Sequence, residues 1–117
     1  MKPIRLIVKT KNQTYPIIIG TNLIKKIPTL LKKNSINFNQ CLFVVDSKIS
    51  KNIIKKITKP YNNKKIFIHY FKANEINKNQ KNVEKIIDIL LKKNFNRKDC
   101  LISIGGGITG DISGFAA

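Results

Sequence analysis

The order of apolar and polar positions predicts that the chain opens with a β-hairpin. Residues 4–9 alternate between the two kinds, and residues 14–19 do so again, as expected of two half-buried strands. Residues 11–13 between them, Lys-Asn-Gln, have the polarity of a hairpin turn. Pro16 lies inside the second stretch and indicates an edge strand or a bulge, because proline cannot donate to a ladder of hydrogen bonds.

The apolar spacing then changes to that of a helix. Thr21 or Asn22 is expected to cap this helix, and Pro28 is expected to kink or restart it. Its apolar positions are Leu23, Ile24, Ile27, Leu30 and Leu31.

Strands and helices alternate over the rest of the chain. Apolar runs predict strands at residues 41–45, 65–71 and 101–104. A short helix capped by Ser47 or Ser50 is expected after the first of them, a longer helix after the second and another helix after the third. The longer helix has its apolar positions at helical spacing: Val83, Ile86, Ile87, Leu90 and Leu91.

This alternation predicts the α/β class, with a Rossmann-like, mostly parallel sheet, helices on both faces and an N-terminal β-hairpin. We expect residues 1–117 to form one nucleotide-binding domain. Ligands of such sheets bind outside the carboxyl ends of the strands. Three loops are therefore expected to meet at that edge: residues 46–48, 73–78 and 105–111.

The last of these loops has the composition of a phosphate-binding site. Gly105, Gly107 and Gly110 match the pattern G-x-G-x-x-G. Glycines let the backbone approach a ligand closely, and the N–H groups at a helix start attract anions. A tight strand-to-helix turn without a ligand is the alternative explanation. Because the glycines follow the last strand and the acidic candidates precede them, the topology differs from the usual dinucleotide-binding fold.

Small residues continue along one stripe of the helix that follows. Gly110, Gly114 and Ala117 lie on this stripe, which predicts a close approach of the helix to the sheet or to a ligand. A glycine inside a helix costs about 1 kcal/mol relative to alanine, so Gly114 requires a packing reason.

Charged residues in the other two loops are candidates for the nucleoside end of a nucleotide. Asp46 ends a strand and could accept a hydrogen bond from a ribose hydroxyl, or it could cap a helix. Glu75 and Lys78 could do the same and flank an adenine. From the residues alone, a solvated surface pair is the favoured interpretation of Glu75 and Lys78.

The net charge of +17, from 23 Lys and Arg against 6 Asp and Glu, raises the alternative of a basic nucleic-acid-binding module. Arg5 and Arg97 are the only arginines, although arginine is the preferred reader of phosphates and bases. The lysines are dispersed, and Lys, Asn and Ile are all residues of A+T-rich codons. We therefore expect no specific nucleic-acid partner, only nonspecific attraction to polyanions at low salt.

The cysteines and the histidine suggest structural roles. Cys41 and Cys100 each begin an apolar run, and we interpret them as small buried hydrophobes, not as a disulfide or a metal pair. His69 is interpreted as a buried or edge-strand residue, so no metal site is expected. The sequence shows neither an apolar run long enough to cross a bilayer nor a secretory signal, which predicts a cytoplasmic protein with no membrane partner.

Residues 105–117, GGGITGDISGFAA, closely resemble the signature GGGxxGDxxGFAA of the 3-dehydroquinate synthase family. Residues 14–17 look like the family's start, and residues 44–46 look like the end of its second strand. Residues 74–78 are similar to its G-E-x-x-K loop, with Asn74 in place of the glycine. The resemblance extends along the whole chain but covers only the nucleotide-binding half of the family's chain.

The resemblance implies an NAD-dependent carbon–oxygen lyase of the shikimate pathway of aromatic amino acid biosynthesis. The family converts 3-deoxy-D-arabino-heptulosonate 7-phosphate to 3-dehydroquinate and phosphate. It uses NAD and a divalent metal, zinc or cobalt, and its full-length members are expected to be homodimers. By position, Glu75 and Lys78 would hold the adenosine end of NAD, and residues 107–111 would hold its pyrophosphate. The candidate cofactor-binding residues are Asp46, Glu75, Lys78, Gly105, Gly106, Gly107, Ile108, Thr109, Gly110 and Asp111.

In the family, the metal ligands and most substrate-binding residues lie in a later, helical domain. The sequence ends inside the helix that follows the glycine loop, so we expect that domain to be absent and the chain to be a truncated form. We expect no residue of this chain to be catalytic or metal-binding, and the chain alone to be inactive and prone to aggregate. Asn74 in place of the loop glycine is expected to alter that turn.

Three alternatives remain open on the sequence. The chain could come from another sugar-phosphate cyclase or a metal-dependent polyol dehydrogenase of the same fold. It could be a basic nucleic-acid-binding module, or the inactive product of a decayed gene. The spacing of residues 110–111 and 114–117 favours the shikimate enzyme over the dehydrogenases and separates it less well from the other cyclases.

Overall fold

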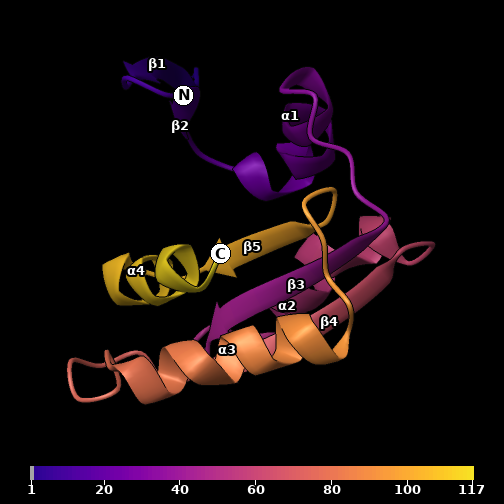
Figure 1. Ribbon diagram of the computed structural model, residues 1–117. Helices are drawn as coiled ribbons and strands as arrows, with labels where there is room; N and C mark the ends of the chain where they lie inside the picture. The colour runs from indigo at the N-terminus through magenta and orange to yellow at the C-terminus, as the bar shows by residue number, and fades with distance from the viewer. Residues whose placement is uncertain (1) are drawn as a thin grey trace.

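The chain, described from residue 2 to residue 117 in a computed structural model, begins with the predicted antiparallel hairpin (Figure 1). Strand β1 (Ile4–Lys9) pairs with strand β2 (Thr14–Ile19) in a two-stranded sheet of their own. The Thr10 N–H closes the turn by donating to the Gln13 carbonyl at 2.8 Å. Each strand of a two-stranded sheet has a free edge, and this accommodates Pro16 as predicted.

The next helix starts twice, as the internal proline predicts. A short 3₁₀ turn, η1 (Leu23–Lys26), leads into helix α1 (Ile27–Lys33), and Pro28 lies in the first turn of α1. Proline is tolerated there because the N–H that it lacks would have no helical partner. The predicted side-chain cap is wrong, because Asn22 precedes η1 in a left-handed conformation (φ 55°) and makes no capping hydrogen bond.

The predicted parallel sheet is confirmed. It contains strands β3 (Gln40–Asp46), β4 (Lys65–Phe71) and β5 (Cys100–Ile104) in the order β4-β3-β5. Strand β3 lies in the middle, and its residues from Cys41 to Val45 are fully buried. A strand that is covered on both faces can be apolar at every position, which is the pattern that predicted it.

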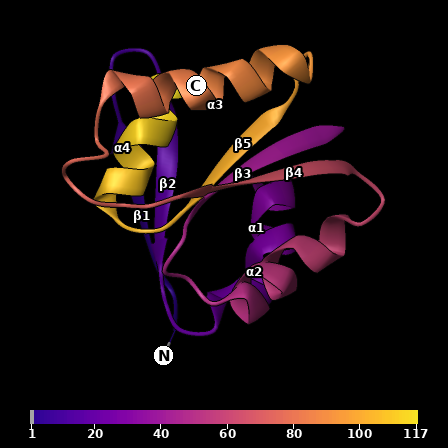
Figure 2. The same ribbon diagram turned by 90° about the horizontal axis from the view of Figure 1, so that it is seen from below.

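Helices cover both faces of this sheet (Figure 2). Helices α1 and α2 (Lys51–Thr58) lie on one face, and the 3₁₀ turn η2 (Lys59–Tyr61) extends α2. Helices α3 (Gln80–Lys92) and α4 (Gly107–Ala116) lie on the other. The core of the first face contains Phe38, Cys41, Phe43, Val45, Ile54 and Ile57. The core of the second contains Leu42, Val44, Phe71, Val83, Ile86 and Ile112.

The connections create a switch point between the central strand and β5. Strands β3 and β5 lie side by side in the sheet. The chain leaves β3 for α2, which covers one face, and leaves β5 for α4, which covers the other face. In open parallel sheets, the carboxyl ends of two such strands border the crevice where ligands bind. The fold therefore points to the ends of β3 and β5 as the place for a site.

Candidate functional site

Gly105 brings the glycine loop against the end of the central strand. It follows β5 directly and has a φ of +154°, a backbone conformation that residues other than glycine rarely adopt. A Cβ on Gly105 would lie 2.7 Å from Thr109 Oγ1 and 3.1 Å from Asp46 Cβ. The loop thus requires glycine here, because the backbone touches both α4 and the residue that ends β3.

Thr109 contributes a buried hydroxyl to the same spot. Its side chain has 0% exposure, and within residues 2–117 its Oγ1 has no hydrogen-bond partner. A buried hydroxyl without a partner is costly in a folded protein and calls for an explanation. Its place beside Gly105, in the first turn of α4, means that the hydroxyl and the free helix N–H groups belong to one loop.

The outer surface of the loop is open. A Cβ on Gly106, Gly107 or Gly110 would meet nothing within 4 Å, and no side chain caps the start of α4 at Gly106. The first helical hydrogen bond runs from the Gly110 N–H to the Gly106 carbonyl at 3.1 Å. A phosphate could therefore approach the backbone of residues 106–110 as closely as glycines allow.

The predicted close packing of the small stripe against the sheet is wrong. A Cβ on Gly110 or Gly114 would enter open space, so neither glycine lies tightly against the strands. Helix α4 instead packs through Ile112 and Ala116, which lie on another stripe of the helix. The packing reason expected for Gly114 is not present among the described residues.

The Asp46 side chain stabilises a turn and does not cap a helix. One of its carboxylate oxygens, Oδ1, accepts a hydrogen bond from the Lys48 N–H at 3.0 Å. The residue that caps α2 is Ser50, whose hydroxyl accepts from the Asn52 N–H at 3.2 Å. Ser50 is thus the correct choice of the two predicted serines, and the helix-cap alternative for Asp46 is wrong. The second oxygen of Asp46 can accept from another donor.

Side-chain hydrogen bonds of asparagines hold the loop after β4. The Asn74 side-chain oxygen accepts from the Asn77 N–H at 2.8 Å, and the Asn77 amide donates to the Lys72 carbonyl at 2.9 Å. Asn74 does not have a positive φ. Asparagine supports such turns through its side chain, and these bonds fix the turn in this chain; whether it differs from a turn with glycine at residue 74 stays a prediction.

Lys78 joins this loop to the glycine loop. Its Nζ lies 3.0 Å from Asp111 Oδ2, in an ion pair whose side chains are 42% and 61% exposed. The hydrogen bond to Asp111, together with the charges of Asp111 and Glu75, raises the pKa of Lys78. The sequence interpretation missed this partner for Lys78, because no local pattern relates residues so far apart. The three predicted loops nevertheless meet at one edge of the sheet, as expected.

Three further features bear on function: metal ligands, membrane-spanning helices and hollows in the surface. Within it, no group of three or more His, Cys, Asp or Glu side chains is placed to hold a metal ion. None of the helices between residues 2 and 117 has the length and apolar character needed to span a membrane. Two hollows of about 680 and 610 Å³ lie at the opposite, amino ends of the strands, and none of the predicted cofactor-binding residues lines them.

Comparisons with known proteins agree on one family. A family model described as 3-dehydroquinate synthase N-terminal matches residues 68–117. The 3-dehydroquinate synthase of Pelagibacter ubique (strain HTCC1062) is 60% identical over 97% of this chain and 31% of its own length. The 3-dehydroquinate synthase of Staphylococcus carnosus (strain TM300) is 34% identical over 92% of this chain and 30% of its own length. The chain thus spans about a third of the length of these relatives.

Solved structures agree on the fold. A crystal structure of 2-deoxy-scyllo-inosose synthase has a TM-score of 0.81, with 18% identity, over 97% of this chain and 32% of that chain. A second structure of that enzyme, complexed with carbaglucose-6-phosphate, NAD+ and Co2+, has a TM-score of 0.80 and 18% identity over 97% of this chain and 31% of its own. Over nearly its whole length, this chain is similar to the N-terminal part of 3-dehydroquinate synthases, which confirms the family that its sequence resembles.

Proposed function

We propose that residues 1–117 form the NAD-binding domain of a 3-dehydroquinate synthase. The whole enzyme would convert 3-deoxy-D-arabino-heptulosonate 7-phosphate, a sugar-acid phosphate, to 3-dehydroquinate and phosphate. The observation that carries the proposal is the contact among Gly105, Thr109 and Asp46 at the switch point of the sheet. The 60% identity to a 3-dehydroquinate synthase favours this enzyme over the other cyclases, which share the fold at 18% identity.

The residues at this edge fit the pyrophosphate of a dinucleotide. The start of α4 offers free N–H groups on glycines whose surface is open, and it carries no acidic residue in its first turn. The orphaned Thr109 hydroxyl lies in the same turn and can donate to a phosphate oxygen. Within the proposal, residues 105–111 hold the pyrophosphate.

The nucleoside end would lie against the other two loops. Asp46 has an oxygen available for a ribose hydroxyl, and Glu75 and Lys78 would hold the adenosine. When it is bound, NAD supplies a hydride acceptor for a substrate hydroxyl. This chain's own residues bind and orient it; none of them is proposed as catalytic.

We further propose that the 117 residues do not complete the reaction alone. The resemblance implies a divalent metal. The side chains of residues 2–117 could not bind it, because no cluster of metal ligands is present among them. The groups that hold a metal and the substrate would then come from polypeptide outside these residues. Turnover of the sugar-acid phosphate by the purified 117-residue chain would overturn this part of the proposal.

Replacing Thr109 by valine tests the NAD site with two readouts of opposite sign. Valine has the shape of threonine but lacks the buried hydroxyl that has no partner. The free energy of unfolding should therefore stay the same or increase. NAD affinity, measured by titration calorimetry on protein of natural length, should fall about tenfold, as expected for the loss of one charge-assisted hydrogen bond.

Thr58→Val is the matched control. The Thr58 hydroxyl is also buried but donates to the Ile54 carbonyl at 3.0 Å, in a helix on the opposite face. Its replacement should lower stability and leave NAD affinity unchanged. Equal NAD affinity in the Thr109→Val variant and the unmodified protein would mean that the Thr109 hydroxyl does not contact the pyrophosphate.

A further inference from the structure

The two cysteines, far apart in the sequence, are direct neighbours in the sheet. Cys41 and Cys100 begin β3 and β5 and lie opposite each other in the parallel register of the two strands. Both side chains lie on the face that α1 and α2 cover. Adjacent strands are about 4.8 Å apart, a separation within the range that a disulfide spans between Cα atoms. Both thiols are free.

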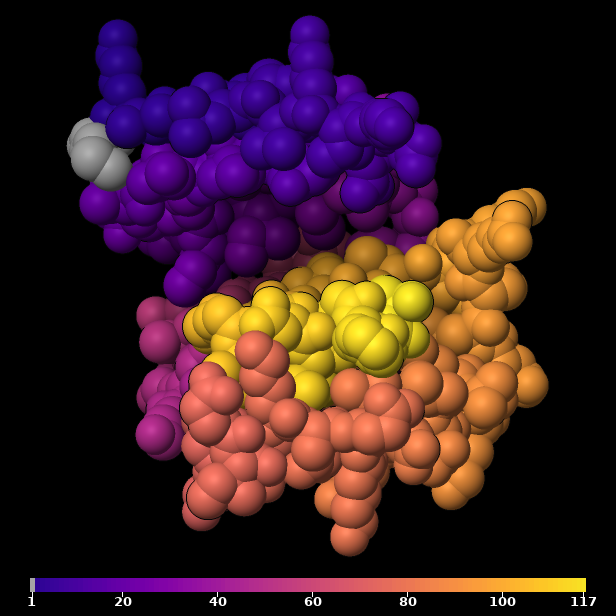
Figure 3. Space-filling model, turned by 60° about the vertical axis from the view of Figure 1, so that its left-hand side comes forward, coloured from indigo at the N-terminus to yellow at the C-terminus, as the bar shows by residue number. Residues whose placement is uncertain are grey.

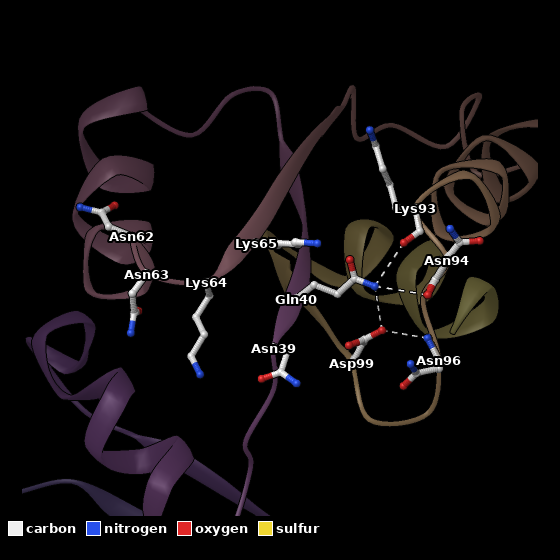
Figure 4. Close-up of a pocket in the computed structure, with 10 residues that line it drawn as sticks. All are labelled: Asn39, Gln40, Asn62, Asn63, Lys64, Lys65, Lys93, Asn94, Asn96 and Asp99. Atoms are coloured by element: carbon white, nitrogen blue, oxygen red, sulfur yellow. Dashed lines mark hydrogen bonds between the residues drawn. The ribbon is translucent and has the colours of Figure 1, made fainter.

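The residues that precede the two cysteines are hydrogen-bonded to each other (Figure 4). Gln40 precedes Cys41, and its side-chain amide donates to the Asp99 carboxylate at 2.8 Å, directly before Cys100. The same amide donates to the Lys93 and Asn94 carbonyls at 3.2 and 3.3 Å. Asp99 also accepts from the Asn96 N–H at 2.8 Å. The amino ends of β3 and β5 are thus tied together beside the thiols.

The two thiols differ in access. Cys41 is fully buried, whereas Cys100 is only partly buried and lines a hollow of about 610 Å³. Three cationic side chains line this hollow: Lys64, Arg97 and Lys98. Its one carboxylate belongs to Asp99, which accepts the hydrogen bonds described above. Cys100 is thus the thiol that a small molecule entering this hollow would meet.

Hydrogen bonding distinguishes the pair in the same direction. A hydrogen bond from the Cys41 thiol lowers the pKa of Cys100. The pKa of Cys41 is raised by that hydrogen bond and by burial. The hydrogen bond thus acts in the same direction as the difference in burial, and both single out Cys100 as the more reactive thiol.

We propose that Cys100 and Cys41 form an oxidisable dithiol that reduces hydroperoxides and closes into a disulfide between β5 and β3. The Cys100 thiolate attacks a peroxide oxygen, the O–O bond breaks, and the leaving oxygen departs as an alcohol or water after protonation, which leaves a sulfenic acid. The Cys41 sulfur then attacks the Cys100 sulfur and the S–O bond breaks. Water leaves with the Cys41 proton. Two thiols are oxidised and one hydroperoxide is reduced.

This inference is independent of the proposed function. The dithiol lies at the amino ends of β3 and β5, whereas Asp46 and Gly105 lie at or after the carboxyl ends of the same strands. The structure confirms that Cys41 belongs to the core, that Cys100 packs against it and that both are free thiols, as the sequence predicted; the proposal adds a redox role to this pair.

The test is oxidation of the purified protein, at its natural length, with cumene hydroperoxide. Alkylation after unfolding and mass spectrometry then follow the two cysteines. The unmodified protein should lose both free thiols and the mass of two hydrogens within one chain, and dithiothreitol should restore both. In Cys41→Ser, Cys100 should remain as a sulfenic acid that dimedone traps. In Cys100→Ser, Cys41 should stay unmodified.

Substitution of a charged surface residue gives a second test, in which both cysteines are kept. Lys98→Gln should slow the oxidation of Cys100 several-fold, because Lys98 lines its hollow, whereas Lys92→Gln on the exposed side of α3 should not. Equal trapping of Cys100 by dimedone in the unmodified protein and in Cys41→Ser would overturn the proposal. So would disulfides found only between chains.

Discussion

At the scale of single residues, Gly105 connects folding with the candidate site. Replacing it by alanine would force a side chain into a φ of +154° and place its Cβ 2.7 Å from Thr109 Oγ1. We expect Gly105→Ala to lower the free energy of unfolding by about 1–3 kcal/mol. Urea denaturation measures this change.

Gly114→Ala provides the matched control. The added Cβ would enter open space within helix α4, so the same substitution should raise stability by up to about 1 kcal/mol. Equal effects of the two substitutions would mean that the loop does not hold Gly105 against Thr109.

His69 makes a prediction about pH. Burial in β4, and secondarily the charge of Lys85, lower the pKa of His69. The unfolded chain therefore binds a proton more readily than the folded chain, and the folded state should lose stability as the pH falls through the unfolded value of about 6.5. His69→Gln should flatten this part of the stability–pH curve measured by denaturation; an unchanged curve would contradict the assignment.

The site shows which residue-level facts a sequence can supply. The glycine spacing predicted the loop, because a tight turn into a helix depends on neighbouring residues. The contact of Gly105 with Asp46 and the pair of Lys78 with Asp111 depend on how strands are ordered, and no local pattern carries that information. The orphaned hydroxyl of Thr109 likewise becomes evident only when its surroundings are known.

At the scale of elements, the cap of α2 can be tested against a neighbouring serine. Ser50 accepts a hydrogen bond from the Asn52 N–H, whereas Ser47 lies in the turn before it and donates its own N–H to the Phe71 carbonyl. Ser50→Ala should cost about 1 kcal/mol of unfolding free energy. Ser47→Ala should cost less, because its bond is made by the backbone; denaturation that shows the reverse order would refute the cap.

Most elements followed from the sequence because their signals are local. Buried strands such as β3 are continuous apolar runs, and α3 repeats its apolar positions at helical spacing. The failure at Asn22 has a local cause too, since its backbone is left-handed, whereas a capping residue has an extended backbone. The strand order β4-β3-β5 had no such signal, because parallel strands pair across whole helices.

At the scale of the whole molecule, the hairpin leaves an apolar face uncovered. Alternation and register place these residues on one face: Ile4, Leu6, Val8, Tyr15, Ile17 and Ile19. Ile4, Leu6 and Ile19 are 51%, 50% and 49% exposed. Figure 3 shows the N-terminal part set apart from α4 by a furrow. An exposed apolar face of this kind favours association.

The net charge of +17 decides how that association should respond to salt. Like charges repel between chains, and salt screens them over about 10 Å at 0.1 M. Sedimentation of the 117-residue chain should therefore show more self-association as salt is added. Binding to polyanions should change in the opposite sense, because it weakens as salt is added. Association that weakened with salt would identify a polyanion contaminant, not the apolar face, as its cause.

A pair of substitutions on the hairpin assigns the association to one face. Leu6→Gln removes an apolar side chain, 50% exposed, from the uncovered apolar face. Ile7→Gln removes one that is 49% exposed from the opposite face, where Arg5 and Lys9 also lie. Because apolar contact scales with continuous apolar area, Leu6→Gln should reduce self-association at high salt more than Ile7→Gln. Equal reduction by both would mean that the chains associate through another surface.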